Sequence, residues 1–282
     1  MPASLFVVAT PIGNLDDITL RALSTLNSVS LIAAEDTRRT GTLLRHFGIT
    51  TATTSLHEHN ERQKLPQLLQ KLADGHDLAL VSDAGTPVVA DPGQRLIAAA
   101  IQQGIRVVPI PGPSAVMAAL MASGLPADSF VFVGFAPSKS NDRNKWLAAL
   151  ADEHRPVVFF EAPHRIRKTL SAINLLLVDR PIIICRELTK LHEEVIRVTS
   201  TDLAALQVTE KGEFSIIIGP KTSANLPEQI AEDKDIYSYF YQLTNKSGVG
   251  RRAALTQTAL KFGLSTNETY SAVERFKNST AP

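Results

Sequence analysis

Acidic and basic side chains that could carry acid–base chemistry follow three short apolar runs of this sequence. Glu35 and Asp36 come directly after the run SLIAA, and Glu187 and Lys190 follow PIIICR. The stretch 161–165, EAPHR, follows a third run, PVVFF. Each stretch alone fits an ordinary ion-pairing loop. Together they place acids and bases where a cleft is expected to form.

A second kind of loop combines small residues, a proline and a carboxylate. Ser82–Pro87 follows the run LALV, and its Asp83 can accept hydrogen bonds from ribose hydroxyls or balance a positive ligand. Gly85 lets a ligand approach the backbone closely, and Pro87 stiffens the exit. Alone, such a turn is more often structural than functional. We expect the acid in Asp91–Gly93 to start the next helix and brace the loop.

The stretch Pro111–Ala115 has the same character. Two prolines fix the backbone on either side of Gly112, and Ser114 is a natural N-cap for a following helix. The result is a rigid turn that presents backbone N–H and C=O groups. A well-made strand-to-helix turn explains these residues equally well when they are taken alone.

Several other kinds of site find little support. The G-x-G-x-x-G and G-x-x-x-x-G-K-[ST] patterns are absent, which argues against the usual dinucleotide and nucleotide-hydrolase sites. His57 and His59 lie among carboxylates in LHEHNE, but no third strong metal ligand follows at a known spacing. We therefore expect no metal, and we place these polar residues at the rim of a site.

The elements that must position these loops form two patterns. Strands without polar alternation, separated by helices, indicate a parallel sheet covered on both faces. Ligands of such sheets bind at the carboxyl ends of the strands, where the first-domain loops described above lie. The expected strands are 5–9, 30–34, 78–82 and 106–110, and the expected helices are 19–26, 38–47, 64–73, 94–103 and 115–123.

A second α/β unit follows, and alternation in EVIRV favours an antiparallel strand and hence a mixed sheet. Its expected strands are 130–135, 156–160, 181–186, 194–198 and 214–218, with helices at 143–150 and 166–177. The fold class is therefore α/β with a small helical tail. The expected divisions are an N-terminal α/β domain at 1–115, a second α/β domain at 116–222, a linker at 223–235 and a helical tail at 236–282.

The tail resembles a helix-turn-helix, with helices expected at 250–262 and 266–277. Ser265 and Glu268 fit a capping box, and Gly263 is expected to end the preceding helix. From Lys246 onward there are six Lys or Arg residues against two Glu, a local net charge of +4. The tail is therefore a candidate for RNA docking, although a small dimerisation element is nearly as plausible.

Composition sets the broad class of protein. The 282 residues are 44% hydrophobic, enough for two cores, and carry a net charge of +1, which does not mark a general nucleic-acid binder. The single cysteine, Cys185, lies in an apolar run and fits a reducing compartment. No leader-like or membrane-spanning stretch stands out. We expect a cytoplasmic protein without membrane contact.

The ordered set of motifs resembles one family closely. Over about residues 4–220 the chain is similar to the ribosomal RNA small subunit methyltransferase I family, within the tetrapyrrole methylase superfamily. Any one motif is weak, but so many in order are specific. The motifs are ATPIGNLDDIT (9–19), AAEDTRRTG (33–41), LHEHN (56–60), LVSDAGTPVVADPG (80–93), VVPIPGPSA (107–115), FFEAPHRI (159–166), RELTKLHEE (186–194) and KGEFSIIIG (211–219).

The resemblance implies a fold and a reaction. The superfamily binds S-adenosylmethionine between two α/β domains, and this family methylates the ribose 2′-hydroxyl of a cytidine in the decoding region of small-subunit ribosomal RNA. Tetrapyrrole enzymes carry a richer glycine loop than Thr10–Asn14 after the first strand. That departure disfavours the alternative of a precorrin-type methyltransferase, and the rigid loops disfavour a non-catalytic RNA-binding protein.

The resemblance also assigns candidate residues and partners. The expected catalytic residues are Glu187, Lys190, Glu35 and Asp36, and the sequence does not decide which of them takes the proton. The expected cofactor contacts are Pro11, Gly13, Ser82, Asp83, Ala84, Gly85, Thr86, Pro87, Val88, Pro111, Gly112, Pro113, Ser114 and Ala115. The expected RNA contacts are Arg38, Arg39, His57, Asn60, His164, Arg165, Arg251 and Arg252. The expected partners are small-subunit ribosomal RNA or the 30S subunit and a second copy of the chain.

Overall fold

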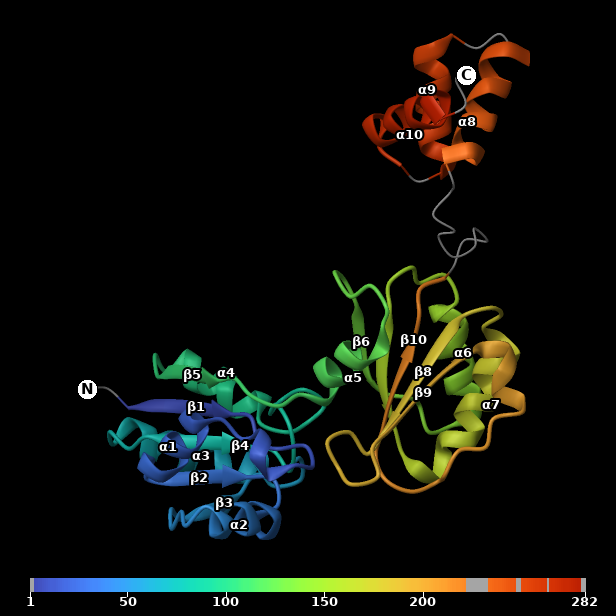
Figure 1. Cartoon of the computed structure of the whole chain (residues 1–282). Helices are drawn as coiled ribbons and strands as arrows, with labels where there is room; N and C mark the ends of the chain where they lie inside the picture. Colours follow the sequence, from blue (N-terminus) through green and yellow to red (C-terminus); the bar gives the residue numbers. More distant parts are fainter. Residues whose placement is uncertain (1–2, 222–232, 247–249, 263, 280–282) are drawn as a thin grey trace. The chain divides into compact units, whose positions relative to one another are not determined.

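The structure is a computed structural model that describes residues 3–221, 233–246, 250–262 and 264–279. Its contacts divide the chain into two compact units, Met1–Lys221 and Thr222–Pro282. Figure 1 shows two sheets in the first unit and a group of helices in the second. Each unit is described by itself below.

The first sheet is entirely parallel, as expected from its uninterrupted apolar runs. Its strands lie in the order β3-β2-β4-β1-β5. They are β1 (Ser4–Val8), β2 (Leu31–Ala34), β3 (Thr53–Ser55), β4 (Leu78–Val81) and β5 (Arg106–Ile110). All five carboxyl ends therefore lie at one edge. The strand β3 was not expected, because its three residues, Thr-Thr-Ser, carry no apolar signal.

Helices cover both faces of this sheet. The helices α1 (Leu20–Ser28) and α2 (Thr37–His46) pack on one face around Leu26 and Ile32. The helices α3 (Glu61–Ala73) and α4 (Gln94–Gln102) pack on the other, around Leu80. A short 3-10 turn, Leu15–Asp17, precedes α1. The helix α3 begins three residues earlier than expected, and it contains Pro66.

The second sheet is mixed, as predicted. Its strands lie in the order β6-β7-β10-β8-β9, and β9 is antiparallel to β8. The strands are β6 (Val131–Phe135), β7 (Val157–Glu161), β8 (Pro181–Arg186), β9 (Glu194–Thr199) and β10 (Phe214–Ile218). The strands β6, β7 and β8 run the same way, while β10 and β9 run against them. One edge therefore gathers the ends of three strands and the starts of two.

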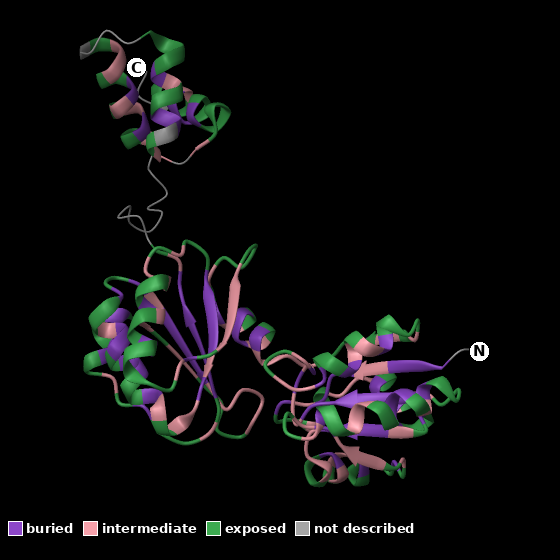
Figure 2. Ribbon diagram, turned by 180° about the vertical axis from the view of Figure 1, so that it is seen from behind, coloured by how far each residue is buried: buried purple, intermediate pink, exposed green. Residues whose placement is uncertain are grey.

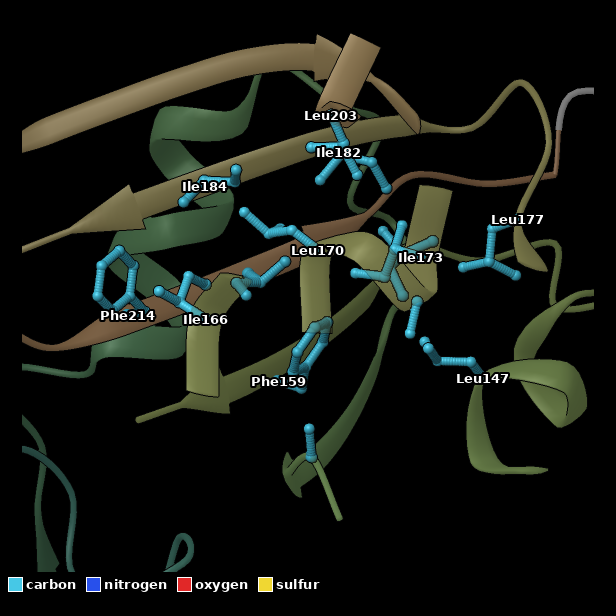
Figure 3. Close-up of a cluster of buried hydrophobic side chains, with 14 of the residues drawn as sticks. Leu147, Phe159, Ile166, Leu170, Ile173, Leu177, Ile182, Ile184, Leu203 and Phe214 are labelled. Atoms are coloured by element: carbon cyan, nitrogen blue, oxygen red, sulfur yellow. The ribbon is translucent and has the colours of Figure 1, made fainter. Parts of the chain in front are cut away.

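Two helix layers cover this sheet as well. The helices α6 (Ser140–Leu150) and α7 (Ile166–Leu176) bury one face, with Phe159, Ile173 and Phe214 in the core drawn in Figure 3. The helix α5 (Ala115–Ser123) packs on the opposite face. Figure 2 shows that the central strands of both sheets are buried. Short 3-10 turns at Pro163–Arg165 and Ser200–Ala204 complete this part.

The domain divisions expected from the sequence stay predictions, with one boundary that differs in detail. Contacts group the two sheets into a single unit that ends at Lys221. The helix α5, which begins at the expected division at 115/116, packs on the second sheet. The helix α8 (Asp233–Tyr241) begins inside the segment expected as a linker over 223–235. Residues 223–232 of that segment lie outside the described residues.

The C-terminal unit is helical. After α8 come a π-helical turn (Gln242–Lys246), α9 (Arg251–Phe262) and α10 (Thr266–Ser279), packed around Ile236, Phe240 and Val273. The capping box is confirmed, because Ser265 Oγ accepts from Glu268 N and Glu268 Oε2 accepts from Ser265 N. The expected helix end at Gly263 lies outside the described residues. In the described parts of the chain, no helix is long and apolar enough to cross a membrane.

Candidate active site

Four loops meet at the carboxyl edge of the first sheet, and direct contacts join all of them. Thr10 and Gly85 form an isolated bridge, in which each N–H donates to the other residue's carbonyl over 2.9 Å. Thr86 Oγ1 donates to Pro113 O at 3.1 Å. The loops after β1, β4 and β5 therefore form one connected wall.

The loop after β4 is held in an uncommon backbone conformation. Gly85 has φ +76°, and a Cβ there would lie 3.3 Å from Ile12 Cγ2 and 3.9 Å from Pro113 O. Val88 and Ala90 have φ values of 74° and 67°, which side chains other than glycine adopt at a cost. The surrounding contacts must hold this segment in place, as expected of a preformed binding loop.

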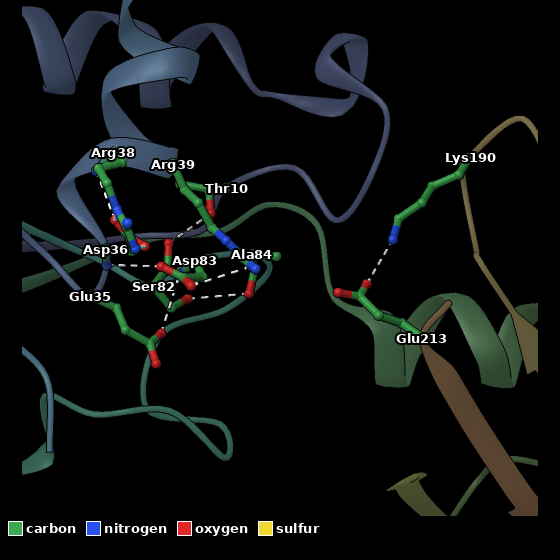
Figure 4. A network of polar contacts seen from close by, with 10 residues as sticks. All are labelled: Thr10, Glu35, Asp36, Arg38, Arg39, Ser82, Asp83, Ala84, Lys190 and Glu213. Carbon is green, nitrogen blue, oxygen red and sulfur yellow. Dashed lines mark hydrogen bonds and ion pairs between the residues drawn. The ribbon is translucent and has the colours of Figure 1, made fainter. Parts of the chain in front are cut away.

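Asp83 ties the loop after β4 to the loop after β2. Its Oδ1 accepts from Asp36 N at 2.9 Å, and its Oδ2 lies 3.3 Å from the Arg39 guanidinium. In return, Glu35 Oε2 accepts from Asp83 N at 3.3 Å (Figure 4). Both carboxylate oxygens of Asp83 are therefore engaged within the protein. A direct contact between Asp83 and a cofactor stays a prediction.

Two acids beside this loop have raised pKa values. Burial and the charge of Asp83 raise the pKa of Glu35, against the opposing hydrogen bond from Asp83 N. Burial, with the nearby charges of Glu35 and Asp83, raises the pKa of Asp91 to about 6. The sequence assigned Asp91 only to the start of α4, whose N-cap is Gly93. It missed the placement of Asp91 beside two other carboxylates.

Asp36 is electrostatically different from Glu35. Its Oδ1 accepts from Arg38 N as the N-cap of α2, and its carboxylate forms two further bonds with the Arg38 guanidinium. The hydrogen bonds from Arg38 hold the pKa of Asp36 well below its usual range. A carboxylate with so low a pKa is a weak base.

The second sheet contributes a lysine held between two carboxylates. Lys190 Nζ lies 2.9 Å from Glu187 Oε1 and 2.9 Å from Glu213 Oε2. Burial lowers the pKa of Lys190, but hydrogen bonds to Glu213 and Glu187 outweigh that effect and raise it. The hydrogen bond from Lys190 lowers the pKa of Glu187. Lys190 is therefore an ammonium and Glu187 a carboxylate at neutral pH.

Glu213 is the residue of this group that the sequence reasoning did not single out. Its backbone N–H donates to Glu187 Oε1 at 2.9 Å, while its own side chain is 68% exposed. The available signal was its place directly before the last strand, in the motif KGEFSIIIG.

The first loop of the N-terminal domain docks on this lysine. A Cβ on Gly13 would lie 2.4 Å from Lys190 Cγ and 2.8 Å from Thr189 Oγ1. Asn14 N donates to Thr189 Oγ1 at 3.1 Å. The glycine is therefore explained by a contact between the two domains. Gly13 as a cofactor contact stays a prediction.

Two hollows flank this loop, and Ile12 lines both. The first, of about 240 Å³, is lined by Thr10, Pro11, Ile12, Gly13, Leu15, Arg39, Thr40, Thr42, Leu43, Ser82, Asp83, Ala84, Lys190 and Glu213. The second, of about 640 Å³, is lined by Ile12, Asp17, Thr19, Gly112, Pro113, Ser114, Met117, Ala118, Met121, Ala122, Thr189 and Glu193. Among the four expected catalytic residues, only Lys190 lines either hollow.

The larger hollow has the size of a small-molecule site. Its lining combines apolar side chains with backbone groups and the carboxylates of Asp17 and Glu193. A Cβ on Gly112 would lie 3.2 Å from Ala9 Cβ, so the glycine keeps the turn close to β1. Gly85, Thr86, Pro87, Val88, Pro111 and Ala115 line neither hollow directly.

The expected RNA contacts in the first unit fall into two groups. Arg38 and His164 are exposed, although Asp36 holds the Arg38 guanidinium. Arg165 instead lies 2.7 Å from the buried Glu161 carboxylate and braces the start of α7. Arg39 is exposed and lies 3.3 Å from Asp83, so all three arginines have an acidic partner within the protein, and their contacts with RNA stay predictions.

The remaining RNA candidates lie in the turn before α3 or in the C-terminal unit, and their contacts with RNA stay predictions. Asn60 Oδ1 accepts from His57 N, which shapes the turn before α3. His57 Nδ1 is buried without a hydrogen-bond partner among the described residues. In the C-terminal unit Arg251 pairs with Glu274, and Arg252 is exposed. Within the described residues, no group of three or more His, Cys, Asp or Glu side chains is arranged to hold a metal ion.

Comparisons with solved structures support the fold. A uroporphyrin-III C-methyltransferase from Thermus thermophilus superposes with a TM-score of 0.55 over 77% of this chain and 94% of its own, at 19% identity. A diphthine synthase superposes with a TM-score of 0.60 over 77% of this chain and 90% of its own, at 14% identity. At such identities the likeness concerns the fold alone.

Sequence comparisons define the family. The family model Tetrapyrrole (Corrin/Porphyrin) Methylases matches residues 4–204. Proteins named ribosomal RNA small subunit methyltransferase I are similar over most of their length. The one from Synechocystis is 49% identical over 79% of this chain and 81% of its own, and the one from Mesorhizobium japonicum is 46% identical over 90% and 87%.

The tetrapyrrole methylase fold expected from the motifs is thus confirmed by both kinds of comparison. The precorrin-type alternative is disfavoured by the identities to the ribosomal RNA enzymes, which far exceed those to the tetrapyrrole enzymes. The chain belongs to the tetrapyrrole methylases and, within them, to the ribosomal RNA small subunit methyltransferase I family.

Proposed function

We propose that this protein transfers a methyl group from S-adenosylmethionine to the ribose 2′-hydroxyl of a cytidine in the decoding region of 16S ribosomal RNA. The relatives named above support the RNA substrate. The structural observation that carries the proposal is the hollow between the two sheets, where Lys190 and Glu213 face the loops after β1 and β4. Figure 4 shows the two groups on opposite sides.

The loops Ser82–Val88 and Pro111–Ala115 are proposed to hold the cofactor, together with the first loop. When bound, the cofactor supplies an electrophilic methyl group on a positively charged sulfur. The protein's own contribution is position, because an in-line displacement needs the attacking oxygen opposite the sulfur. The hydrogen bonds among the three loops fix that geometry before any ligand arrives.

The second domain is proposed to handle the hydroxyl proton. Lys190 lines the smaller hollow, and its ammonium group is proposed to donate a hydrogen bond that orients the 2′-oxygen. As an ammonium it does not accept the proton. Glu213 lines the same hollow, is largely exposed and lies 2.9 Å from Lys190 Nζ. Of the carboxylates near the ribose, Glu213 is the best placed to receive the proton.

The function is tested by methyl transfer from labelled S-adenosylmethionine to small ribosomal subunits and to free 16S ribosomal RNA. A 2′-O-methyl group blocks the neighbouring linkage against alkaline cleavage, so the labelled product is expected as an alkali-resistant dinucleotide. Label recovered on a base, or on a tetrapyrrole instead of RNA, contradicts the proposal. Full activity in a well-folded chain truncated before residue 236 would exclude an essential role of the C-terminal unit in docking.

The roles at the site are tested by single-turnover rates. Loss of a proton acceptor costs about 10²- to 10⁴-fold. Glu213→Gln is therefore expected to slow methyl transfer by that factor and to leave S-adenosylmethionine affinity unchanged. Asp36→Asn is expected to retain the wild-type rate. A wild-type rate in Glu213→Gln, with a large loss in Glu35→Gln or Glu187→Gln, moves the acceptor role to that residue.

The cofactor contacts are tested separately by calorimetric titration with S-adenosylmethionine. A valine at Gly85 meets both the left-handed backbone and Ile12, so Gly85→Val is expected to weaken binding strongly. Asp83→Ala is expected to weaken it indirectly, by releasing Asp36 N and Arg39. Unchanged affinity in both variants contradicts the assignment of this loop.

A cytoplasmic homodimer is also proposed. The ribosomal RNA substrate of the relatives supports the compartment. Support for a second copy comes from exposed apolar side chains of α5: Met117 and Met121, which also line the larger hollow, are 49% and 86% exposed. Light scattering of the purified chain should give twice the monomer mass. Met121→Glu is expected to shift the protein to monomers, whereas exposed Leu175→Glu on α7 is not.

A further inference from the structure

The carboxyl edge of the second sheet carries a solvent-exposed aromatic residue that the proposed reaction does not use. Phe135 ends the edge strand β6 and is 54% exposed. Its ring centroid lies 5.5 Å from that of Phe160 on β7. One part of the ring is therefore supported by the protein, and the rest is open to a ligand.

A bulge in β6 gives Phe135 this direction. Val131 and Val133 pack toward α6 and α7, whereas Phe132 packs toward α5, next to Phe160. Simple alternation would send residue 135 to the α6–α7 face. The register instead shifts between Phe132 and Phe135, where Gly134 has φ +68°. The bulge turns Phe135 onto the same face as Phe160.

The charge of this edge suits an anionic ligand. Lys139 follows Phe135 in the next loop, and Lys211 precedes β10; both side chains are exposed. Three acids near this edge are paired with cations: Glu161 with Arg165, Glu210 with Arg167 and Glu213 with Lys190. Among the described ion pairs, none engages Lys139 or Lys211.

The loop after β6 is also fixed in place. Arg143 of α6 is buried, and its guanidinium donates to Pro137 O and Ser138 O over 3.4 and 3.3 Å. Ala136 N donates to Phe160 O. A preformed backbone directly after Phe135 lowers the entropy lost when a ligand is ordered against it.

The same edge leads to the proposed reaction site. From β6 it runs past the end of β7 and the start of β10 to the end of β8, where Glu187 and Lys190 lie. Three strand spacings of ~4.8 Å separate these points, about 14 Å in all. That distance corresponds to a few nucleotides of a single strand.

We propose that Phe135 is a stacking platform for an unpaired base of single-stranded RNA, a few nucleotides from the ribose held near Lys190, with Lys139 and Lys211 contacting the intervening phosphates. The inference rests on the proposed function for the identity of the RNA. Bases stack on aromatic side chains whatever their sequence, and lysines bind phosphates, so the platform would position the strand without selecting its sequence.

The test is fluorescence anisotropy of the full-length protein with a labelled, unstructured RNA of about 12 pyrimidine nucleotides, a length within the range of single-strand sites. Base–aromatic stacking corresponds to about a 5- to 150-fold change in affinity. Phe135→Ala is expected to weaken binding by a factor in that range, with an unchanged salt dependence. Phe135→Trp should bind like the wild type. Lys139→Ala should reduce the slope of log Kd against log salt by about 0.7.

Two matched controls separate stacking from general damage. Leu175 is 76% exposed on α7, on the other face of the sheet, and Leu175→Ala should bind RNA normally. Gly134 and Gly124 both have positive φ and open space around a built Cβ. Gly134→Ala strains the bulge and should weaken RNA binding, whereas Gly124→Ala should not.

The outcomes distinguish this inference from the proposed function. A Kd for Phe135→Ala within twofold of the wild type, or no measurable RNA binding by the wild type, overturns the platform. Methyl transfer by the wild type to small ribosomal subunits is measured separately. If the wild type transfers no methyl group but Phe135→Ala still loses RNA affinity, the platform stands and the proposed reaction falls.

Discussion

The contact between Gly13 and Lys190 predicts the effect of a single methyl group. In Gly13→Ala the new Cβ would lie 2.4 Å from Lys190 Cγ and 2.8 Å from Thr189 Oγ1. Ordinary contact requires about 1 Å more separation. The affected carbon sits near the backbone of Lys190, so the side chain cannot simply swing its far end away. The loop 187–193 must move, or the first loop must.

The expected magnitudes follow from that displacement. Overpacking by one methyl group costs about 1–3 kcal/mol of unfolding free energy. A shift of about 1 Å at Lys190 would also disturb its bonds to Glu187 and Glu213, and misplacement on that scale costs about 10²-fold in rate. Gly13→Ala should therefore slow single-turnover methyl transfer by about 10²-fold, with smaller effects on cofactor affinity.

A double-mutant cycle in urea unfolding separates the clash from other effects of the alanine. Lys190→Ala removes two of the three nearest atoms, Cγ and Cε. In the Lys190→Ala background, Gly13→Ala should lower the free energy of unfolding by less than about 1 kcal/mol. Gly41 lies inside α2 with no atom closer than 4.0 Å to a built Cβ, so Gly41→Ala should stabilise the protein by about 0.5–1 kcal/mol. An equal cost for Gly13→Ala in both backgrounds refutes the reasoning.

Two further predictions concern buried charge. The pKa of Asp91 is raised to about 6, so the stability it contributes is present below its unfolded pKa and lost as pH rises through 6. In urea titrations the free energy of unfolding of Asp91→Asn should therefore exceed that of the wild type by about 1 kcal/mol at pH 7.5, after discounting for solvent screening, and equal it near pH 4. A difference in unfolding free energy that does not change with pH contradicts this prediction. Arg180 is buried and donates to the carbonyls of Leu150, Ala151 and Gly219. Arg180→Met leaves these carbonyl acceptors unpaired and should lower the free energy of unfolding by about 2–5 kcal/mol, measured as a lowered Tm. A loss of less than about 1 kcal/mol would show that water replaces the guanidinium.

The sequence predicted the main strands because burial on both faces leaves a local signal. Runs such as LALV and PIIIC are apolar at every position, as expected of strands in a sheet covered on both faces. The loops after them were predicted to converge because parallel strands end at one edge. The strand β3 was missed because Thr53–Ser55 pairs with β2 through its backbone, and backbone pairing leaves no mark in such a short polar segment.

The partners of individual site residues were not predictable from the sequence. Gly13 was assigned to a cofactor, but its nearest neighbours are Thr189 and Lys190, more than 170 positions away in the sequence. Asp83 was expected to face a ligand, yet its two oxygens are taken by Asp36 N and Arg39. A motif specifies which residues occur near a site, whereas the three-dimensional packing decides which atoms remain available.

The protonation states divide the site into two halves with different tasks. In the first domain Glu35, Asp83 and Asp91 lie close together, with one arginine, Arg39, beside Asp83, an arrangement that favours a cationic ligand. In the second domain Lys190 engages Glu187 and Glu213, so its acids are largely neutralised. We therefore propose that the positively charged methyl donor binds against the first sheet. On this proposal the RNA backbone lies along the edge of the second sheet.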